Sequence, residues 1–108
     1  MLYKNMTPHE LVIYNTKKEK VLTVPPSGEV ARVGTKRKLY NVVNGIEFWD
    51  MFYTDKPEFE TKEDTIYIVS GAVKALYPNR LDVVSPGELL RDEKGKPYGC
   101  VGLNALVG

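Results

Sequence analysis

The sequence predicts a mainly β protein: a small antiparallel barrel or sandwich of about seven or eight short strands with one short helix. Runs of β-branched and aromatic residues recur along the chain, and turn-forming residues separate them. Only one stretch, Gly71 to Tyr77, reads as a helix. Because 108 residues leave room for one core, residues 1–108 are expected to form a single domain.

The first strands are expected to form a hairpin followed by a single strand. Residues 10–14 and 21–24 are rich in β-branched residues, and the polar stretch between them predicts a turn. The turn-forming residues Pro25-Pro26-Ser27-Gly28 then end the second strand. Residues 29–33 alternate polar and apolar side chains, which predicts a half-buried strand.

A second hairpin is predicted around Asn44-Gly45, which separates residues 39–43 from residues 46–53. Asn-Gly is typical of a type I′ turn, because both central residues of that turn adopt positive φ. Lys36-Arg37-Lys38, just before this hairpin, is expected to be a solvated loop or a guard of a strand edge. Residues 54–64 are acidic and read as a loop.

The second half of the chain is expected to hold the helix and a last hairpin. Residues 65–69 predict a strand, and the helix that follows is expected to stop before Pro78-Asn79. Ser85-Pro86-Gly87 is expected to turn the chain. Residues 89–91 and 98–103 are then expected to pair through the polar stretch between them.

The composition excludes several classes of protein. A net charge of +1 gives no general electrostatic reason to bind nucleic acid or an anionic membrane, so neither partner is expected. No apolar run approaches the ~18 residues of a membrane span, and the first residues do not resemble a signal peptide, so we expect a cytoplasmic protein. The single cysteine, Cys100, excludes an internal disulfide and a four-cysteine zinc site.

The residue types that usually carry catalysis are sparse and isolated. His9 is the only histidine, and no further ligand stands at a spacing typical of a metal site, although His9 could hydrogen-bond a ligand. Cys100 lies between Gly99 and Val101 with no marked base, which indicates a core residue rather than a nucleophile. We therefore expect a protein that is not an enzyme, has no catalytic residues, and needs no cofactor or metal.

Ser70 and Gly71 stand at the predicted junction between strand and helix. The Ser70 hydroxyl can cap the helix by accepting a hydrogen bond from an amide two or three residues later. The free amides of the same turn, with Gly71 allowing close approach, can also bind an anion. Capping is the commoner role because most helices need a cap, and the two roles are compatible.

Three arginines, Arg32, Arg80 and Arg91, lie in stretches that are otherwise apolar or turn-like. The planar guanidinium suits carboxylate or phosphate recognition. The alternative is a structural ion pair, of Arg80 with Asp82 or of Arg91 with Asp92 or Glu93. The residues expected to bind a ligand are Ser70, Gly71, Arg80, Arg91, Arg32, His9, Trp49 and Tyr53.

The hairpin around Asn44-Gly45 carries aromatic residues on both faces. Strand alternation places Phe48 and Phe52 on one face, and Trp49 and Tyr53 on the other. Since so small a core cannot bury both faces, one face is expected to stack on a ligand or to join another chain. We expect self-association, most simply as a dimer.

Short blocks along most of the chain form a recognisable set: Asn5-Met6-Thr7-Pro8-His9, Pro26-Ser27-Gly28 with Ala31-Arg32-Val33, Thr65-Ile66-Tyr67-Ile68-Val69-Ser70, Pro78-x-Arg80-x-Asp82, Pro86-Gly87, Arg91-Asp92-Glu93-x-Gly95 and Gly99-Cys100. In these blocks the chain resembles a family of small, mostly unannotated proteins encoded by bacteriophages and prophages. Residues 36–64 depart from the family's pattern, being richer in aromatics and acids. The resemblance implies a phage origin and carries no activity with it.

These expectations favour a binding module over an enzyme. A nucleotide offers phosphates to arginine and a base for stacking on tyrosine or tryptophan. By analogy with phage proteins that sequester host nucleotide immune signals, the expected function is sponge-type, anti-defence binding of such a signal in the host cytoplasm. The alternative is a protein–protein module, either an inhibitor of a host protein or a small virion component.

Overall fold

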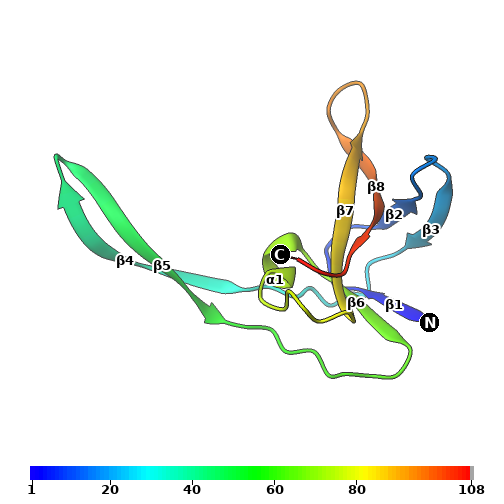
Figure 1. Ribbon diagram of the computed structural model, residues 1–108, viewed down its shortest axis with the longest axis horizontal. Coiled ribbons are helices and arrows are strands. Elements are labelled where there is room, and N and C mark those ends of the chain that lie inside the picture. Colours follow the sequence, from blue (N-terminus) through cyan, green and yellow to red (C-terminus); the bar gives the residue numbers. More distant parts are fainter. Residues whose placement is uncertain (108) are drawn as a thin grey trace.

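The computed structural model describes residues 1–107 and shows a β protein with one short helix (Figure 1). The elements in chain order are β1 (Leu2–Asn5), β2 (Leu11–Tyr14), β3 (Lys20–Val24), β4 (Gly34–Val43), β5 (Ile46–Asp55), β6 (Thr65–Ile68), α1 (Gly71–Lys74), β7 (Val83–Arg91) and β8 (Pro97–Asn104). Six strands form one sheet in the order β1-β6-β7-β8-β2-β3, while β4 and β5 form a separate two-stranded sheet. The prediction of a small, mainly β, barrel-like protein with one short helix is confirmed.

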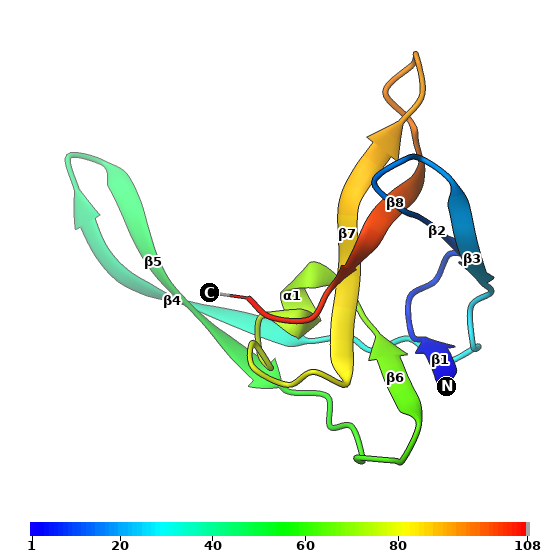
Figure 2. The same cartoon turned by 45° about the vertical axis from the view of Figure 1, so that its right-hand side comes forward.

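The six-stranded sheet curls into a nearly closed barrel (Figure 2). Its outer strands, β1 and β3, come together where Asn5 bridges to Pro26, just beyond the end of β3. The buried side chain of Asn5 closes this gap, because its Nδ2 donates to the carbonyls of Val24 (3.0 Å) and His9 (2.9 Å). Its Oδ1 accepts from the amide of Thr7 (3.0 Å), so the buried amide group is fully paired.

Strand pairing is mixed in direction, whereas the sequence predicted an antiparallel sheet. β2–β3, β4–β5 and β7–β8 are antiparallel, but β1–β6, β6–β7 and β2–β8 are parallel. An antiparallel hairpin can be recognised in a sequence from the residues of its turn. The parallel pairs set Tyr3 beside Ile66 and Ile13 beside Cys100, and no local sequence pattern reports such distant partners.

The wall formed by β6 and β7 is buried on both sides. Inside the barrel, Ile68 and Val84 pack with residues of three other strands, Ile13, Val24 and Cys100. On the outer side, alternate residues of the same two strands pack with α1 and the loop before β6, in a cluster of Ala31, Phe59, Tyr67, Val69, Val73 and Val83. The helix and that loop therefore cover the outside of the barrel wall, and this second core positions the loops described below.

Two of the strand and turn predictions are wrong. Residues 29–33 form no strand; the amide of Ala31 donates to the carbonyl of Met6 (3.0 Å), but no strand pairs with this segment. Ser85-Pro86-Gly87 does not turn the chain and lies inside β7. β6 pairs with β7 only at Val83 and Val84. At Pro86, the side of β7 that faced β6 has no strand beside it, so a residue without an amide hydrogen is tolerated there.

The helix is shorter than predicted. Its last residue is Lys74, with Ala75 as the C-cap, and the chain continues to Tyr77 in tighter turns closed by hydrogen bonds to residues three positions earlier. Among residues 1–107, no helix is long and apolar enough to cross a membrane.

β4 and β5 leave the barrel together as a long hairpin, the arm (residues 34–55), at the left of Figure 1. Its turn is the predicted one, because Asn44 and Gly45 have φ values of 52° and 79°. Lys36-Arg37-Lys38 lies within β4 rather than in a loop. Every residue of the arm except Gly34 is exposed, including five aromatic residues: Tyr40, Phe48, Trp49, Phe52 and Tyr53.

Candidate ligand-binding site

A hollow of about 230 Å³ lies where the start of α1 meets two other segments of the chain. Residues 6–7, which follow β1, residues 30–33, which precede β4, and the side of α1 that carries Ser70 and Val73 line it. Most of the lining side chains are apolar, and Thr7, Arg32 and Ser70 supply the polar groups. An apolar hollow with a few polar groups is the usual form of a small-molecule site.

Of the residues that the structure describes, Arg32 is the only charged one that lines this hollow. It is exposed, and within residues 1–107 it forms no ion pair. Its neighbour Ala31 is buried and donates its amide to the carbonyl of Met6 (3.0 Å), so the backbone that carries Arg32 is held in place. The result is an uncompensated guanidinium on a fixed backbone, a suitable partner for a carboxylate or a phosphate.

Ser70 caps the helix, as the sequence predicted: its Oγ accepts from the amide of Val73 (3.4 Å). Ser70 also borders the hollow, so Ser70 and Arg32 are the two predicted residues that the fold brings to one site. Gly71 follows Ser70 but does not line the hollow. With only four residues, α1 contributes little macrodipole, so the chemistry of this site rests on side chains rather than on the helix end.

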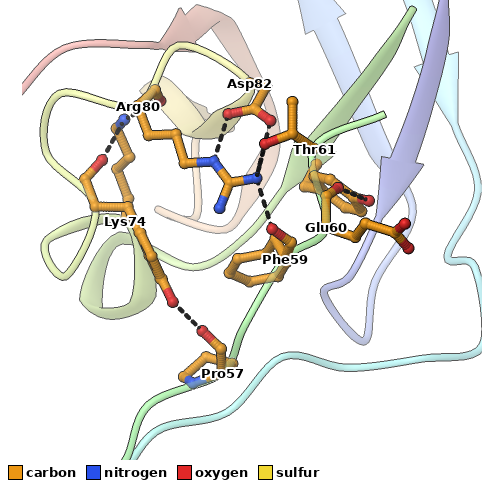
Figure 3. Close-up of polar contacts among 9 residues, drawn as sticks. Pro57, Phe59, Glu60, Thr61, Lys74, Arg80 and Asp82 are labelled. Atoms are coloured by element: carbon orange, nitrogen blue, oxygen red, sulfur yellow. Dashed lines mark hydrogen bonds and ion pairs between the residues drawn. The ribbon is translucent and has the colours of Figure 1, made fainter. Parts of the chain in front are cut away.

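Arg80 lies in a network on the outer side of the barrel wall (Figure 3). Its Nε and Nη2 donate to the two carboxylate oxygens of Asp82, at 2.7 Å and 3.0 Å, and Nη2 also donates to the carbonyl of Phe59 (2.6 Å). The hydrogen bond from Arg80 is the main cause that lowers the pKa of the Asp82 carboxyl. The ion pair that the sequence offered as an alternative is therefore present, and a ligand-binding role for Arg80 stays a prediction.

Lys74 lies beside this network and was not singled out in the sequence. Its side chain is fully buried, and its Nζ donates to the carbonyls of Tyr77 and Arg80, both at 2.9 Å. Burial lowers the pKa of the Lys74 ammonium, although nearby Asp82 acts in the opposite direction. Lys74 fixes the loop between α1 and β7. No local signal marks it, because a lysine in a short helix usually faces water.

The remaining predicted polar residues lie elsewhere. His9 borders a second hollow of about 320 Å³ between residues 7–12 and the β7–β8 hairpin, and Thr7 borders both hollows. Arg91 lies at the far end of β7, where its Nη1 donates to the carbonyl of Gly95 (2.9 Å) in the hairpin turn. Ligand contacts by His9 and Arg91 stay predictions, since neither residue lines the hollow beside Arg32.

Trp49 and Tyr53 lie on the arm, outside both hollows. They share a face of β5, and Arg37 from β4 lies over the Trp49 ring with its guanidinium carbon 4.4 Å from the ring centroid. This face combines an aromatic surface with a cation. Arg37 was missed as a functional candidate because the basic stretch that contains it was interpreted as a loop or edge guard.

Other reactive groups add nothing to the site. Cys100 is fully buried in the barrel interior, and burial raises the pKa of its thiol, in agreement with the predicted core role. Among residues 1–107, no group of three histidine, cysteine or acidic residues is placed to hold a metal ion. No protein-family model, curated protein or solved structure matches the chain.

Proposed function

We propose that the chain is a non-enzymatic binding protein that holds an anionic, aromatic small molecule, a nucleotide, at the hollow beside Arg32. The observation that carries this proposal is the position of Arg32: an exposed arginine without an ion-pair partner among residues 1–107, next to Ser70 at a mostly apolar hollow. Arginine suits a phosphate group, while apolar side chains suit the flat faces of a base.

The size of the hollow sets how much of the ligand it takes. Small-molecule sites that enclose their ligand usually have volumes of roughly 300–1,000 Å³. At about 230 Å³, this hollow holds part of a nucleotide and leaves the rest accessible to other groups. Arg32 stands two residues before the arm begins at Gly34, so the hollow lies next to the base of the arm.

The resemblance to bacteriophage proteins supports a more specific form of the proposal: the chain sequesters a host nucleotide immune signal and so serves immune evasion. Sequestration requires tight binding without turnover, which agrees with the scarcity of catalytic residue types in the sequence. It places the protein in the cytoplasm of the infected host cell, where such a signal is made.

The test is a thermal-shift panel of cyclic and ADP-ribose-type nucleotides on the purified protein. One nucleotide class is expected to raise the melting temperature in a concentration-dependent way. Arg32→Ala is expected to abolish that shift while keeping the melting temperature of the free protein, because Arg32 is exposed. Arg32→Lys is expected to bind more weakly, since a single ammonium cannot make a bidentate contact.

Lys17→Ala serves as the control, because it removes one exposed positive charge from the β2–β3 turn, outside both hollows. Equal loss in Lys17→Ala would indicate general electrostatics rather than a site. Recovery of the bound nucleotide, chemically unchanged, after denaturation separates sequestration from hydrolysis. A panel without any shift would overturn the nucleotide proposal.

A protein–protein module, either an inhibitor of a host protein or a small virion component, is the second candidate function. The observation that favours it is the arm, whose exposed aromatic and aliphatic residues resemble the core of an interface more than a free surface. This candidate predicts no nucleotide shift for the wild type or for any Arg32 variant.

A further inference from the structure

We propose that the protein is a two-fold dimer in which the β5 edges of two arms pair antiparallel, forming a four-stranded sheet in the order β4-β5-β5-β4. This inference concerns a surface distinct from the Arg32 hollow, and it stands whether or not a nucleotide binds there. It rests on the exposure of the arm, on the excess surface area of the chain, and on the difference between the two edges of the arm.

The arm is not a stable unit by itself. A two-stranded hairpin in water is at best marginally stable, and stability usually needs a third strand or a packed face. Ten large hydrophobic residues of the arm are each at least 42% exposed, and they lie on both of its faces. Figure 2 shows the arm projecting from the barrel with no other element of the chain packed along it. We therefore expect a partner that covers the arm.

The chain exposes more surface area than a compact monomer of its mass, and the excess matches the area that one partner would cover. A monomeric protein of 12.2 kDa exposes roughly 6,100 Å². This chain exposes 7784 Å², so the excess is roughly 1,700 Å² per chain. Burying that excess on each of two copies would create an interface within the ~2,000–5,000 Å² range of obligate homodimers. The projecting arm also explains the radius of gyration, which is 16.8 Å against roughly 13 Å for a compact chain of this length.

The charges of the arm balance within one copy of the chain. Lys36, Arg37 and Lys38 lie toward its base, and Glu47 lies beside the turn at its tip. In the order β4-β5-β5-β4 these basic residues stay on the outer strands, where Lys38 lies opposite Asp50 of its own β5. Asp50 and Asp55 bring the arm to three positive and three negative charges, so two copies join without net repulsion.

The two edges of the arm differ in their capacity to pair. The free edge of β4 is interrupted at Tyr40, where one extra residue shifts the register between Leu39 and Asn41, and three basic residues precede that bulge. Bulges and lysines are the usual protection of a strand edge. β5 pairs in regular register from Ile46 to Tyr53, with Asp50 as the only charge between Phe48 and Tyr53. A two-fold axis displaced from Asp50 keeps the two carboxylates apart.

The experiment compares two aspartate variants on the same arm by light scattering and sedimentation at micromolar protein. The wild type is expected at roughly 24 kDa, twice the chain mass of 12.2 kDa. Met51→Asp, in the middle of β5, is expected to give a folded monomer; Met51 is 62% exposed, so the barrel core is untouched. Tyr40→Asp, at the β4 bulge, is the matched control: Tyr40 is 78% exposed, and the variant is expected to remain a dimer because β4 lies outside the proposed β5 seam.

A wild-type monomer would overturn the proposal and assign the arm to a different protein, as the second candidate function requires. Dissociation by Tyr40→Asp but not by Met51→Asp would overturn the β5 assignment. Circular dichroism of both variants establishes that the barrel is folded. Because Arg32 lies outside the arm, a dimer that fails to bind nucleotides would disprove only the proposed ligand, and a monomer that binds them would disprove only the dimer.

Discussion

The guanidinium of Arg80 and the carboxylate of Asp82 meet in a two-point contact, although only one residue separates them along the chain. The same Nη2 that donates to Asp82 also donates to the carbonyl of Phe59, 21 residues earlier. Through Arg80, the loop after α1 is joined to the loop before β6 (Figure 3). The arginine that the sequence offered as a ligand contact therefore joins two loops of the fold.

Arg80→Ala is expected to lower the free energy of unfolding by about 1–3 kcal/mol, because it leaves Asp82 without its charged donor. Urea unfolding of the two proteins measures the difference. Arg80→Lys is the control and should fall between them, because it keeps the positive charge but loses the two-point contact. Equal stability of Arg80→Ala and wild type would show that the network adds nothing, and would leave Arg80 available for a ligand.

Because of Lys74, the free energy of unfolding is expected to increase with pH at alkaline pH. Its pKa is lower in the folded protein than the unfolded value of 10.5, so between the two values the unfolded chain binds more protons. The penalty for burying the charged ammonium is present at neutral pH and is relieved as pH rises through the folded pKa. Urea unfolding at several pH values up to about 10 measures this slope, and Lys74→Met should lack it. If the wild type and Lys74→Met show the same pH dependence, groups other than Lys74 cause it.

Gly87→Ala is expected to be strongly destabilising. A Cβ at Gly87 would clash with the carbonyl oxygen of Val101, so β7 and β8 would have to separate. A loss of more than ~3 kcal/mol would place it among severe core substitutions. Gly71→Ala is the matched control: its Cβ would meet nothing within 4 Å, and the expected gain is about 0.5–1 kcal/mol. Similar melting temperatures for the two variants would contradict the close approach of β7 and β8.

Gly45→Val is expected to destabilise the arm by about 1–2 kcal/mol, because it forces a β-branched residue to positive φ. Faster hydrogen exchange of the β4 and β5 amides and a lower melting temperature would record the loss. Asn44→Gly should be tolerated, since glycine adopts the φ of 52° found there without strain. Unchanged exchange in Gly45→Val would count against the type I′ turn.

The elements that could be predicted are those specified by their own residues. Asn44-Gly45 requires positive φ at two positions, and Ser70 caps the residues that follow it, so both were identified from local chemistry. The segment at residues 29–33 has the alternation of a strand but no neighbour to pair with. β1 was missed because its partner, β6, begins 60 residues after β1 ends.

The candidate site was only partly predictable for the same reason. Arg32 and Ser70 come from segments that meet through packing of Ala31 and Val73 in one core cluster, and no spacing in the sequence reports that contact. Arg80 was identified as an arginine suited to bidentate contact, and its partner is the carboxylate two positions later. The sequence analysis had offered this ion pair as the alternative to ligand binding by Arg80.

The strand order has a consequence for how the chain folds as it is made. β2 pairs with β3 and β8, while β8 also pairs with β7, so the last strand joins the N-terminal hairpin to β7; on the other side of the barrel, the contact is the bridge between Asn5 and Pro26. Until residues 97–104 have left the ribosome, the barrel cannot close, because β8 lies between β7 and β2. The local β4–β5 hairpin, in contrast, forms within microseconds of its synthesis. Its apolar edge is thus exposed in each nascent chain well before the barrel exists, when polysomes hold many copies close together, and cotranslational pairing or aggregation begins there.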